Sequence, residues 1–368
     1  MRVLHIIPSL QKGGAERLVI DIVAFLNQIE NVEARIALFH DDIEYDIRHI
    51  IDKIDIIPSA IHLSVWKKNR ILVKDLQTYL EQFKPDIIHS HLFEAEIVSR
   101  SCMYTKAKWF THCHDNMKVF ETPNCSSLFD KTKLSQLYEK KYLLSRYRLN
   151  MSNVFIAISE NTKEYFVQNT TGYKVEMLPN AIEYDKYYAP IVEKTALNLI
   201  AVGRLDENKN YSFLIDVANT LKKKEVPFSL KIIGDGVQKN ELQSKVNQLG
   251  LAEYVHLLGK RSDVPFLLQK SSIFLHSAKS EAFGLTLIEA MAAGLPVITL
   301  DGGGNRDLIK EGQNGYLVRA NSEAFAQQIV NLWNNKNLYK HIALFAQGFS
   351  KNFDIKTYIQ QLLAIYES

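Results

Sequence analysis

Short runs of β-branched and apolar residues alternate with longer amphipathic stretches, and this alternation constrains the fold more than any other feature of the chain. In the first half, strands are expected at residues 2–7, 34–39, 86–91, 108–114 and 154–159. In the second half, they are expected at residues 197–203, 229–236, 255–259, 272–277 and 296–300. Continuous apolar strands joined by helical crossovers form parallel sheets that are covered on both faces. The pattern therefore predicts an α/β protein with doubly wound parallel sheets.

Helical periodicity fills most of the intervals between these strands. The expected helices are 15–28, 70–83, 93–104, 131–149, 209–223, 237–248, 263–269, 285–293 and 322–334, with a final amphipathic helix at 353–368. A chain of 368 residues exceeds the usual size of a single core, so two domains are expected. Residues 180–196 lack clear periodicity, which puts the predicted boundary there and gives domains at 1–183 and 184–352.

Composition argues against several classes of protein. The net charge of +3 is too small for a dedicated nucleic-acid binder, and an apolar fraction of 46% is ordinary for a globular protein. Three cysteines, Cys102, Cys113 and Cys125, have no CxxC spacing and are expected to be reduced thiols. No apolar run approaches a membrane span, and the first residues do not resemble a signal peptide. A cytoplasmic location is therefore expected.

Glycine is concentrated in the second half, where it tends to follow the strands. Gly203, Gly234, Gly259 and the run 302–304 all stand at expected strand ends. Ligands of doubly wound sheets bind beyond the carboxyl ends of strands, where glycine lets the backbone approach them closely. The second half is therefore predicted to bind a nucleotide.

The segment KSEAFGLTLIEAMAAGLPVI, residues 279–298, contains two glutamates eight residues apart. Gly284 would permit a turn into a helix, and the amides of residues 283–286 would then form a seat for phosphate at the positive end of the helix dipole. Glu281 would face the group that is attached to the phosphate. Glu289 could accept hydrogen bonds from both hydroxyls of a ribose. The alternative for Glu289 is a solvent-facing position on an amphipathic helix.

Two cations, Arg204 and Lys209, follow an expected strand end. Such a pair beside a helix start suits a diphosphate, because it neutralises charge that builds up as a bond to that group breaks. Gly13 and Gly14 similarly open the first helix after the first strand, although any tight strand-to-helix turn can use glycine.

Histidines gather at two expected strand ends of the first half. In THCHDN, residues 111–116, His114 could hydrogen-bond a hydroxyl, whereas His112 is expected on the other face of the strand as a packing residue. His89 and His91 form a second pair, which is expected to line the core and a cleft, since a zinc site would need third and fourth ligands.

The quoted segment resembles the E-x7-E signature of retaining glycosyltransferases of family 4, also called glycosyl transferases group 1, which have the GT-B fold. Ala282 stands where this family commonly has glycine. The resemblance extends over essentially the whole chain, and in particular it is similar to enzymes of bacterial surface-polysaccharide assembly. The supporting segments are IPSLQKGGAERLV (7–19), VGRLDENKNYSFLI (202–215), GDGVQKNEL (234–242), LLGKRSDV (257–264) and GGGNRDLIKEGQNGYLV (302–318).

The resemblance implies two Rossmann-like domains facing across a cleft, with the acceptor in residues 1–183, the nucleotide-sugar donor in 184–352, and helix 353–368 packing back on the first domain. It implies a UDP- or GDP-sugar donor, a glycan or lipid-linked acceptor, retention of configuration, and neither a metal nor another cofactor. The implied catalytic residues are His114, Glu281, Arg204 and Lys209, and the implied acceptor-side residues are His114, Asp115 and Asn116. The implied donor-binding residues are Gly13, Gly14, Arg204, Lys209, Gly234, Lys260, Arg261, Glu281, Phe283, Gly284, Leu285, Thr286 and Glu289.

Three alternatives stay open at this stage. The basic stretch WKKNR (66–70) and the helix expected within 131–150 could rest on an anionic membrane, or the helix could simply pack on its own domain. A nucleotide-sugar epimerase would share the architecture but act without an acceptor. A catalytically silent partner subunit would keep the fold without binding a donor.

Overall fold

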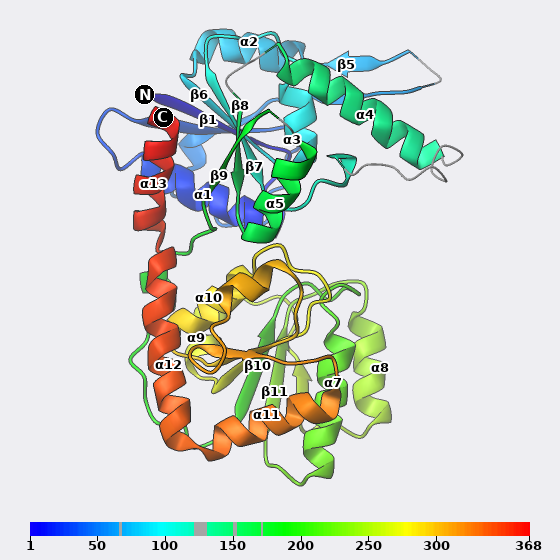
Figure 1. Ribbon diagram of the computed structural model, residues 1–368, viewed down its shortest axis with the longest axis vertical. Coiled ribbons are helices and arrows are strands. Elements are labelled where there is room, and N and C mark those ends of the chain that lie inside the picture. The colour runs from blue at the N-terminus through cyan, green and yellow to red at the C-terminus, as the bar shows by residue number, and fades with distance from the viewer. Residues whose placement is uncertain (66–67, 121–130, 150–152, 171) are drawn as a thin grey trace. The chain divides into compact units, whose positions relative to one another are not determined.

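The computed structural model describes residues 1–65, 68–120, 131–149, 153–170 and 172–368. The chain divides into two compact units (Figure 1). Unit 1 comprises Met1–Asn180 together with Ile355–Ser368, and unit 2 comprises Ala181–Asp354. The last helix of the chain is therefore part of the same unit as the first strand.

Unit 1 contains a seven-stranded sheet in the order β3-β2-β1-β6-β7-β8-β9, and every neighbouring pair in it is parallel. Its strands are β1 (Arg2–Ile7), β2 (Glu33–Leu38), β3 (Ile54–Ile56), β6 (Ile87–His91), β7 (Lys108–Cys113), β8 (Asn153–Ala157) and β9 (Lys174–Met177). A separate antiparallel pair consists of β4 (Ala60–His62) and β5 (Arg70–Leu72). The helices are α1 (Gly14–Leu26), α2 (Lys74–Phe83), α3 (Leu92–Ser99), α4 (Lys131–Tyr147), α5 (Glu160–Asn169) and α13 (Ile355–Glu367).

Unit 2 contains a six-stranded parallel sheet in the order β12-β11-β10-β13-β14-β15. Its strands are β10 (Asn198–Val202), β11 (Ser229–Ile233), β12 (Val255–Leu257), β13 (Ile273–His276), β14 (Val297–Thr299) and β15 (Gly315–Leu317). Its helices are α6 (Tyr184–Tyr187), α7 (Tyr211–Lys223), α8 (Lys239–Gln248), α9 (Val264–Gln269), α10 (Leu285–Ala292), α11 (Ser322–Asn334) and α12 (Lys336–Ser350). The predicted fold class, α/β with two doubly wound parallel sheets, is confirmed.

Both sheets have a point at which the strand order reverses. In unit 1 the first strand β1 lies between β2 and β6, and in unit 2 the first strand β10 lies between β11 and β13. Ligands of open parallel sheets bind at such a point, beyond the carboxyl ends of the strands. The loops after β1, β6 and β7, and those after β10 and β13, are therefore where a site is expected.

Helix α13 joins unit 1 through its apolar face. Tyr358, Leu362 and Tyr366 are buried, and the helix packs against α1. The hydroxyl of Tyr366 lies 2.6 Å from Nδ1 of His89, so the helix also reaches the side chains at the carboxyl end of the sheet. Burying each large apolar side chain contributes about 2 kcal/mol, which ties the end of the chain to its beginning.

Several predicted boundaries were wrong. The helix expected at 70–83 begins at Lys74, because residues 70–72 form the strand β5. The prediction missed β3, β4, β9 and β15, which have only three or four residues each, and it also missed α5, α6 and α12. Such short strands show too few alternations of polarity to be distinguished from loops.

Candidate functional site

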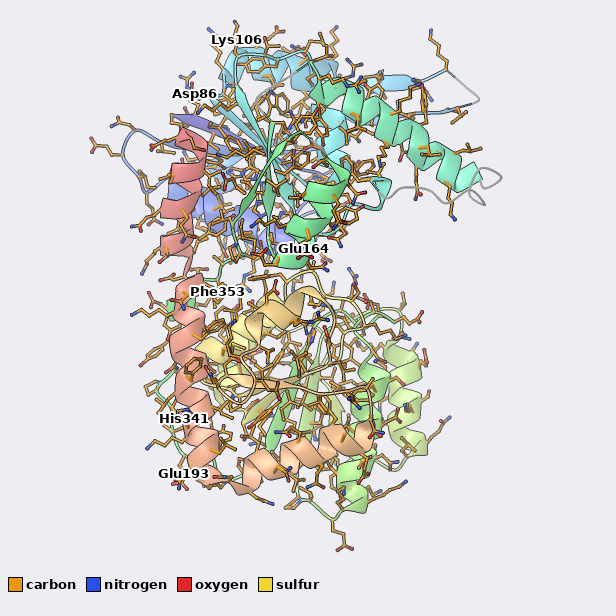
Figure 2. All side chains as sticks on the ribbon, in the orientation of Figure 1. Asp86, Lys106, Glu164, Glu193, His341 and Phe353 are labelled. Atoms are coloured by element: carbon orange, nitrogen blue, oxygen red, sulfur yellow. The ribbon has the colours of Figure 1, made fainter. Side chains whose placement is uncertain are left out.

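The turn before α10 has the backbone that the sequence predicted. Gly284 precedes the helix with φ of +105°, a left-handed conformation that side chains disfavour. Phe283 is buried, and its ring packs edge-on against that of Phe353, at a centroid distance of 5.9 Å. Figure 2 labels Phe353, which follows helix α12. Leu285 and Thr286 form the first turn of the helix, whose leading N–H groups lack partners within the helix itself. The turn therefore presents the positive end of the helix dipole beside Glu281.

The glycine-rich loop after β14 holds the backbone of Glu281. The amide of Glu281 donates to the carbonyl of Gly302 at 2.7 Å, and the amide of Gly304 donates to the carbonyl of Glu281 at 2.8 Å. A Cβ at Gly304 would overlap the carbonyl oxygen of Ala282, so only glycine fits this approach of two backbones. Glycines that the sequence associated with ligand approach thus also serve loop-to-loop packing.

A second set of contacts ties the loop after β10 to the loop after β13. Asn208 accepts from the amide of Ser280 at 3.0 Å and donates to the carbonyl of Ser280 at 2.8 Å. The hydroxyl of Ser277 donates to the carbonyl of Lys209 at 2.7 Å. These bonds bring two residues that are far apart in the sequence together, with Nζ of Lys209 lying 2.5 Å from Oε2 of Glu281.

Glu281 is the centre of a partly buried charged network. Burial alone would raise its pKa, but the hydrogen bond from His276 and the charge of Lys209 outweigh burial and lower the pKa to about 2. Nε2 of His276 lies 3.1 Å from the carboxylate, and its Nδ1 lies 2.8 Å from the hydroxyl of Thr299. Burial lowers the pKa of His276, while Glu281 partly offsets that effect. The carboxylate is therefore ionised and oriented from two sides.

Sequence reasoning missed His276. It is the last residue of β13, and a polar residue at the end of a buried strand was the available signal.

Arg204 lies in the same loop as Lys209 but is exposed, and its guanidinium lies 2.5 Å from the carboxylate of Asp206. Asp206 also accepts from the backbone amide of Lys209 at 2.9 Å. Both cations thus have carboxylate partners, and an anionic ligand would compete with them. Packing also explains why glycine stands at position 234, since a Cβ of Gly234 would overlap the carbonyl oxygen of Gly203.

Glu289 is buried, with 5% of its surface exposed, in a helix whose neighbouring side chains are also buried. The alternative of a solvent-facing Glu289 is therefore wrong.

After β12, the guanidinium of Arg261 makes a bidentate pair with Asp263, with N–O distances of 2.8 and 2.7 Å, and Lys260 precedes it. Both lie in the loop that follows an edge strand of the unit 2 sheet.

In unit 1, Gly13 precedes α1 with extended backbone and Gly14 begins the helix. The hydroxyl of Tyr45 donates to the carbonyl of Gly13 at 2.8 Å. A Cβ at Gly13 would overlap the carboxylate of Glu16, which lies over this turn. The side chain of Lys12, which precedes these glycines, is exposed.

His114, Asp115 and Asn116 follow β7 directly. Asp115 is exposed, and the amide of Asn116 donates to Asn161 at 3.3 Å. The placement of His112 on the opposite face was wrong, because residues two apart in a strand share a face. The rings of His112 and His114 in fact stack, with centroids 4.2 Å apart and planes 12° apart.

The argument that His89 and His91 lack further ligand partners was also wrong. His5, His112 and His114 bring ring nitrogens within reach of this pair. Burial lowers the pKa of His5 and of His112 to about 3, so these imidazoles are neutral near pH 7. Unit 1 thus holds a cluster of five neutral histidines toward the carboxyl ends of its central strands, where a ligand is expected.

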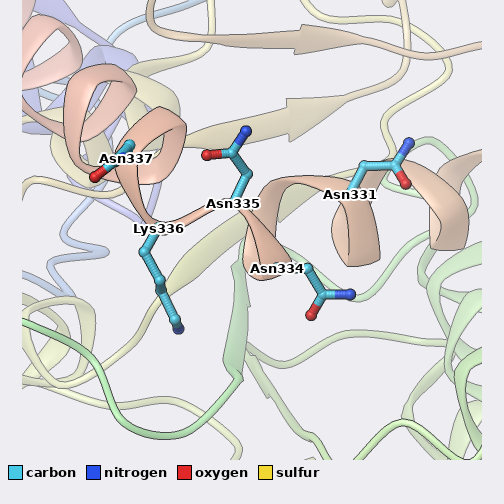
Figure 3. Close-up of a pocket in the computed structure, with 5 residues that line it drawn as sticks. All are labelled: Asn331, Asn334, Asn335, Lys336 and Asn337. Carbon is cyan, nitrogen blue, oxygen red and sulfur yellow. The ribbon is translucent and has the colours of Figure 1, made fainter.

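A surface hollow of about 670 Å³ lies where α11 meets α12 (Figure 3). None of the predicted site residues lines it. The lining residues are Asn331, Asn334, Asn335, Lys336 and Asn337. Neutral amides and a single cation do not form a reactive group, so the hollow has no part in the proposed chemistry.

Two further sequence expectations bear on the surroundings of the protein. Among the residues that the structure describes, none of the helices is both long enough and apolar enough to cross a membrane. Cys102 and Cys113 are buried free thiols, and Cys125 lies outside the described residues.

Fold and site together define a class. Two Rossmann-like parallel sheets are the architecture of α/β proteins of the GT-B type, and the loops at the switch point of the second sheet hold an ionised carboxylate and a lysine beside a glycine-opened helix. Two family models agree: Glycosyltransferase Family 4 matches residues 12–186, and Glycosyl transferases group 1 matches residues 190–348. The two matches together leave only short segments uncovered, so each half of the chain matches a family of glycosyltransferases.

Individual relatives support this assignment. The chain is 27% identical to an N-acetylgalactosaminyltransferase of Campylobacter jejuni that acts on an N-acetylgalactosamine-N,N'-diacetylbacillosaminyl-diphospho-undecaprenol, over 94% of each chain. It is 29% identical to the putative glycosyltransferase EpsD of Bacillus subtilis, over 46% of this chain and 45% of EpsD. The chain spans about half the length of two curated relatives that it matches, EpsD among them. The crystal structure of Anabaena HepE in complex with UDP has the same fold, with a TM-score of 0.78 and 22% identity over all of both chains.

Proposed function

We propose that the chain is a retaining glycosyltransferase that moves a sugar from a UDP- or GDP-sugar to a hydroxyl acceptor without a metal ion. The observation that carries this proposal is the pairing of Lys209 with Glu281 at 2.5 Å, directly before the glycine-opened start of α10. A cation and a helix dipole can together neutralise a diphosphate leaving group. The adjacent carboxylate can accept hydrogen bonds from the hydroxyls of the donor sugar.

The proposed roles follow from the positions of the side chains. Lys209, Arg204 and the amides of residues 283–286 would bind the diphosphate, and Glu289 would bind the ribose. Because Lys209 already pairs with Glu281, binding of a diphosphate would draw the ammonium away from the carboxylate. The carboxylate would then be available to the sugar, so that donor binding and orientation of Glu281 are coupled.

The remaining positions keep the roles that the resemblance implies. His114, Asp115 and Asn116 would contact the acceptor. The other donor-side positions would be Gly13, Gly14, Gly234, Lys260 and Arg261. All of them lie after the carboxyl ends of parallel strands, the edge at which such sheets bind ligands.

The names of similar proteins support a choice of substrates. HepE was crystallised with UDP, which favours a uridine nucleotide in the donor. The Campylobacter relative transfers to a sugar carried by diphospho-undecaprenol. We therefore propose a lipid-linked glycan as the acceptor, in the assembly of a bacterial polysaccharide or lipopolysaccharide.

The donor site can be tested by thermal unfolding with UDP, GDP, ADP and CMP. A nucleotide at about 100 times its dissociation constant should stabilise the protein by about 2.7 kcal/mol, which corresponds to a rise of a few degrees in the unfolding midpoint. Lys209→Met should abolish the rise. Lys279→Met is the matched control, because Lys279 belongs to the adjoining loop but pairs with the exposed Glu207 at 3.0 Å. No rise with any nucleotide would favour the silent-subunit alternative.

Incubation with the selected nucleotide sugar distinguishes transfer from epimerisation. Consumption of donor that requires a hydroxyl acceptor supports transfer, and the anomeric configuration of the product tests retention. Conversion of the donor to an epimer without an acceptor would contradict the proposal.

Lys68 and Arg70 are exposed, and we propose that this edge of unit 1 rests on the inner face of the cytoplasmic membrane. Trp66 and Lys67 lie outside the described residues. Binding to liposomes with anionic lipid that is lost in a Lys68→Gln, Arg70→Gln double variant would support membrane contact. Absence of binding by the unaltered protein would contradict it.

A further inference from the structure

Five histidines, from three neighbouring central strands and the residue after one of them, lie together toward the carboxyl ends of these strands in the unit 1 sheet. β1 lies beside β6, and β6 beside β7, so the register pairs His5 with His89 and His91 with His112. His114 follows on the next residue after β7. His5, His89, His91 and His112 are fully buried, and His114 is partly buried. Burying so many imidazole rings is costly, because each ring has two nitrogens that would form hydrogen bonds with water in the unfolded chain.

Hydrogen bonds join three of these rings head to tail. Nδ1 of His5 lies 2.8 Å from Nε2 of His91, and Nδ1 of His91 lies 3.0 Å from Nε2 of His114. The two outer nitrogens, Nε2 of His5 and Nδ1 of His114, are buried without a hydrogen-bond partner among the described residues. The three rings form a chain with two open ends, hereafter the imidazole chain.

The geometry of the imidazole chain couples the tautomers of its rings. Burial lowers the pKa of each ring well below its ordinary value, so each ring is neutral and has one N–H and one bare nitrogen. Every link joins an Nδ1 to an Nε2, and one of the two must donate. If His5 carries its proton on Nδ1, then His91 and His114 must as well. If His114 carries its proton on Nε2, the other two must carry theirs there.

A metal ion is the competing explanation for such a cluster. Two trios, His5 with His89 and His91, and His91 with His112 and His114, have nitrogens close enough to share an ion. Each trio, however, contains a pair of stacked rings, with centroids 4.4 Å apart for His89 and His91 and 4.2 Å apart for His112 and His114. The lone pair of an imidazole nitrogen lies in the ring plane, so two stacked rings do not direct their lone pairs at one point. Hydrogen bonds also occupy both nitrogens of His91, which belongs to both trios.

We propose that His91 and His5 are positioning residues that fix which nitrogen of His114 carries its proton. Because Nε2 of His114 is engaged by His91, Nδ1 is the atom that His114 can offer to a substrate. That atom donates when the three rings are in the Nδ1–H form and accepts when they are in the Nε2–H form. An oxygen that accepts from Nδ1 draws all three rings into the Nδ1–H form, and a hydroxyl that donates to it draws them into the Nε2–H form. The role of this coupling in sugar transfer rests on the proposed function. The coupling of the three tautomers itself does not depend on that function.

The cluster also supplies a matched control. His112 stacks on His114, but Nδ1 of His112 lies 3.2 Å from Nε2 of His89, whose Nδ1 lies 2.6 Å from the hydroxyl of Tyr366. Replacing His112 therefore removes a ring that touches His114 without breaking a link of the imidazole chain. Replacing His91 breaks both links.

Ring nitrogen resonances of the full chain labelled with ¹⁵N-histidine test the proposal, since protonated and bare nitrogens have well-separated shifts. Near pH 8, His5, His91 and His114 should show equal fractions of the Nδ1–H form. His91→Leu should make the fractions of the remaining two rings differ, and His112→Leu should leave the three equal. Unequal fractions in the unaltered protein would overturn the proposal without reference to any variant. Stoichiometric shifts on adding zinc, reversed by a chelator, would overturn it in favour of a metal site.

The kinetics of sugar transfer test whether the coupling matters for activity. His91→Leu should lower kcat about 10- to 100-fold, the loss typical for removing a partner that orients a functional group, with KM for the donor changed much less. His112→Leu should keep kcat nearly unchanged. An unaltered kcat in His91→Leu would overturn the positioning role. No transfer by the unaltered protein would instead contradict the proposed function, and the ring spectra would still decide the coupling.

Discussion

Mild acid should destabilise unit 1, because its histidines are buried in the neutral form. The unfolded chain protonates histidine below the ordinary pKa of 6.5, whereas the folded state lowers the pKa of His5 and His112 to about 3. The unfolded state therefore binds more protons between these values, and stability falls as the pH falls. The contribution of the neutral rings is fully present above about pH 6.5 and is lost progressively toward pH 3.

The size of the effect follows from the two pKa values. Lowering the pH from about 7 to about 5.5 costs about 1.2 kcal/mol for each such ring, and therefore about 2.5 kcal/mol for His5 and His112 together. Burial also lowers the pKa of His89, His91 and His114, which adds to the loss in the same direction. A loss of this size is a large fraction of the stability of a typical domain, about 5–15 kcal/mol.

Hydrogen exchange measured by mass spectrometry at both pH values, corrected for the intrinsic exchange rate, resolves the two units. Peptides from β1, β6 and β7 should lose protection at the lower pH. In unit 2, Glu281 has its pKa lowered to about 2, so its contribution persists above the ordinary carboxylate pKa and should not change in this window. The lowered pKa of the buried His276 should give unit 2 a loss of the same sign as in unit 1, from one ring instead of five. In His112→Leu the pH dependence should shrink by about 1.2 kcal/mol. Unchanged protection of unit 1, or the same pH dependence in His112→Leu, would refute the reasoning.

Two substitutions test the packing around the sites. Gly234→Ala should destabilise unit 2 by roughly 2 kcal/mol or more, measured by urea unfolding, because the new Cβ overlaps the carbonyl oxygen of Gly203; an unchanged midpoint would show that these loops separate readily. Glu96→Gln should destabilise unit 1 by about 3–5 kcal/mol, since Arg100, 2.8 Å away and equally buried, would keep an uncompensated charge; a loss below about 1 kcal/mol would mean that other groups compensate Arg100.

The sequence allowed the fold class and the local form of the α10 turn to be predicted because both depend on contiguous residues. Alternating apolar runs indicate parallel sheets, and a glycine before a helical run indicates a left-handed turn. The pairing of Lys209 with Glu281 was not predicted, because it depends on contacts between loops. Those contacts exist because β10 and β13 are neighbours in the sheet, an order that no short motif specifies.

Glycine shows a different limit of prediction. The positions after the strands of unit 2 were interpreted as places where backbone approaches a ligand. At Gly234 and Gly304 the structure shows that a neighbouring carbonyl oxygen already occupies the space of a Cβ. Close packing of two loops and close approach of a ligand require the same residue, so the residue alone does not distinguish them. The resulting ligand assignment of Gly234 stays a proposal.

The histidines show most clearly what sequence reasoning lacked. His5, His89 and His112 stand in three expected strands. His89 was considered only with His91 and His112 only with His114, and His5 was not considered. In a parallel sheet the carboxyl ends of adjacent strands share one edge, so the strand order β1-β6-β7 makes these residues a single group. Once they are a group, their nitrogens cannot be assigned separately, because a proton placed on one ring of the imidazole chain determines the next. Any role given to His114 is therefore also a statement about His5, and the ring spectra of those two residues test it together.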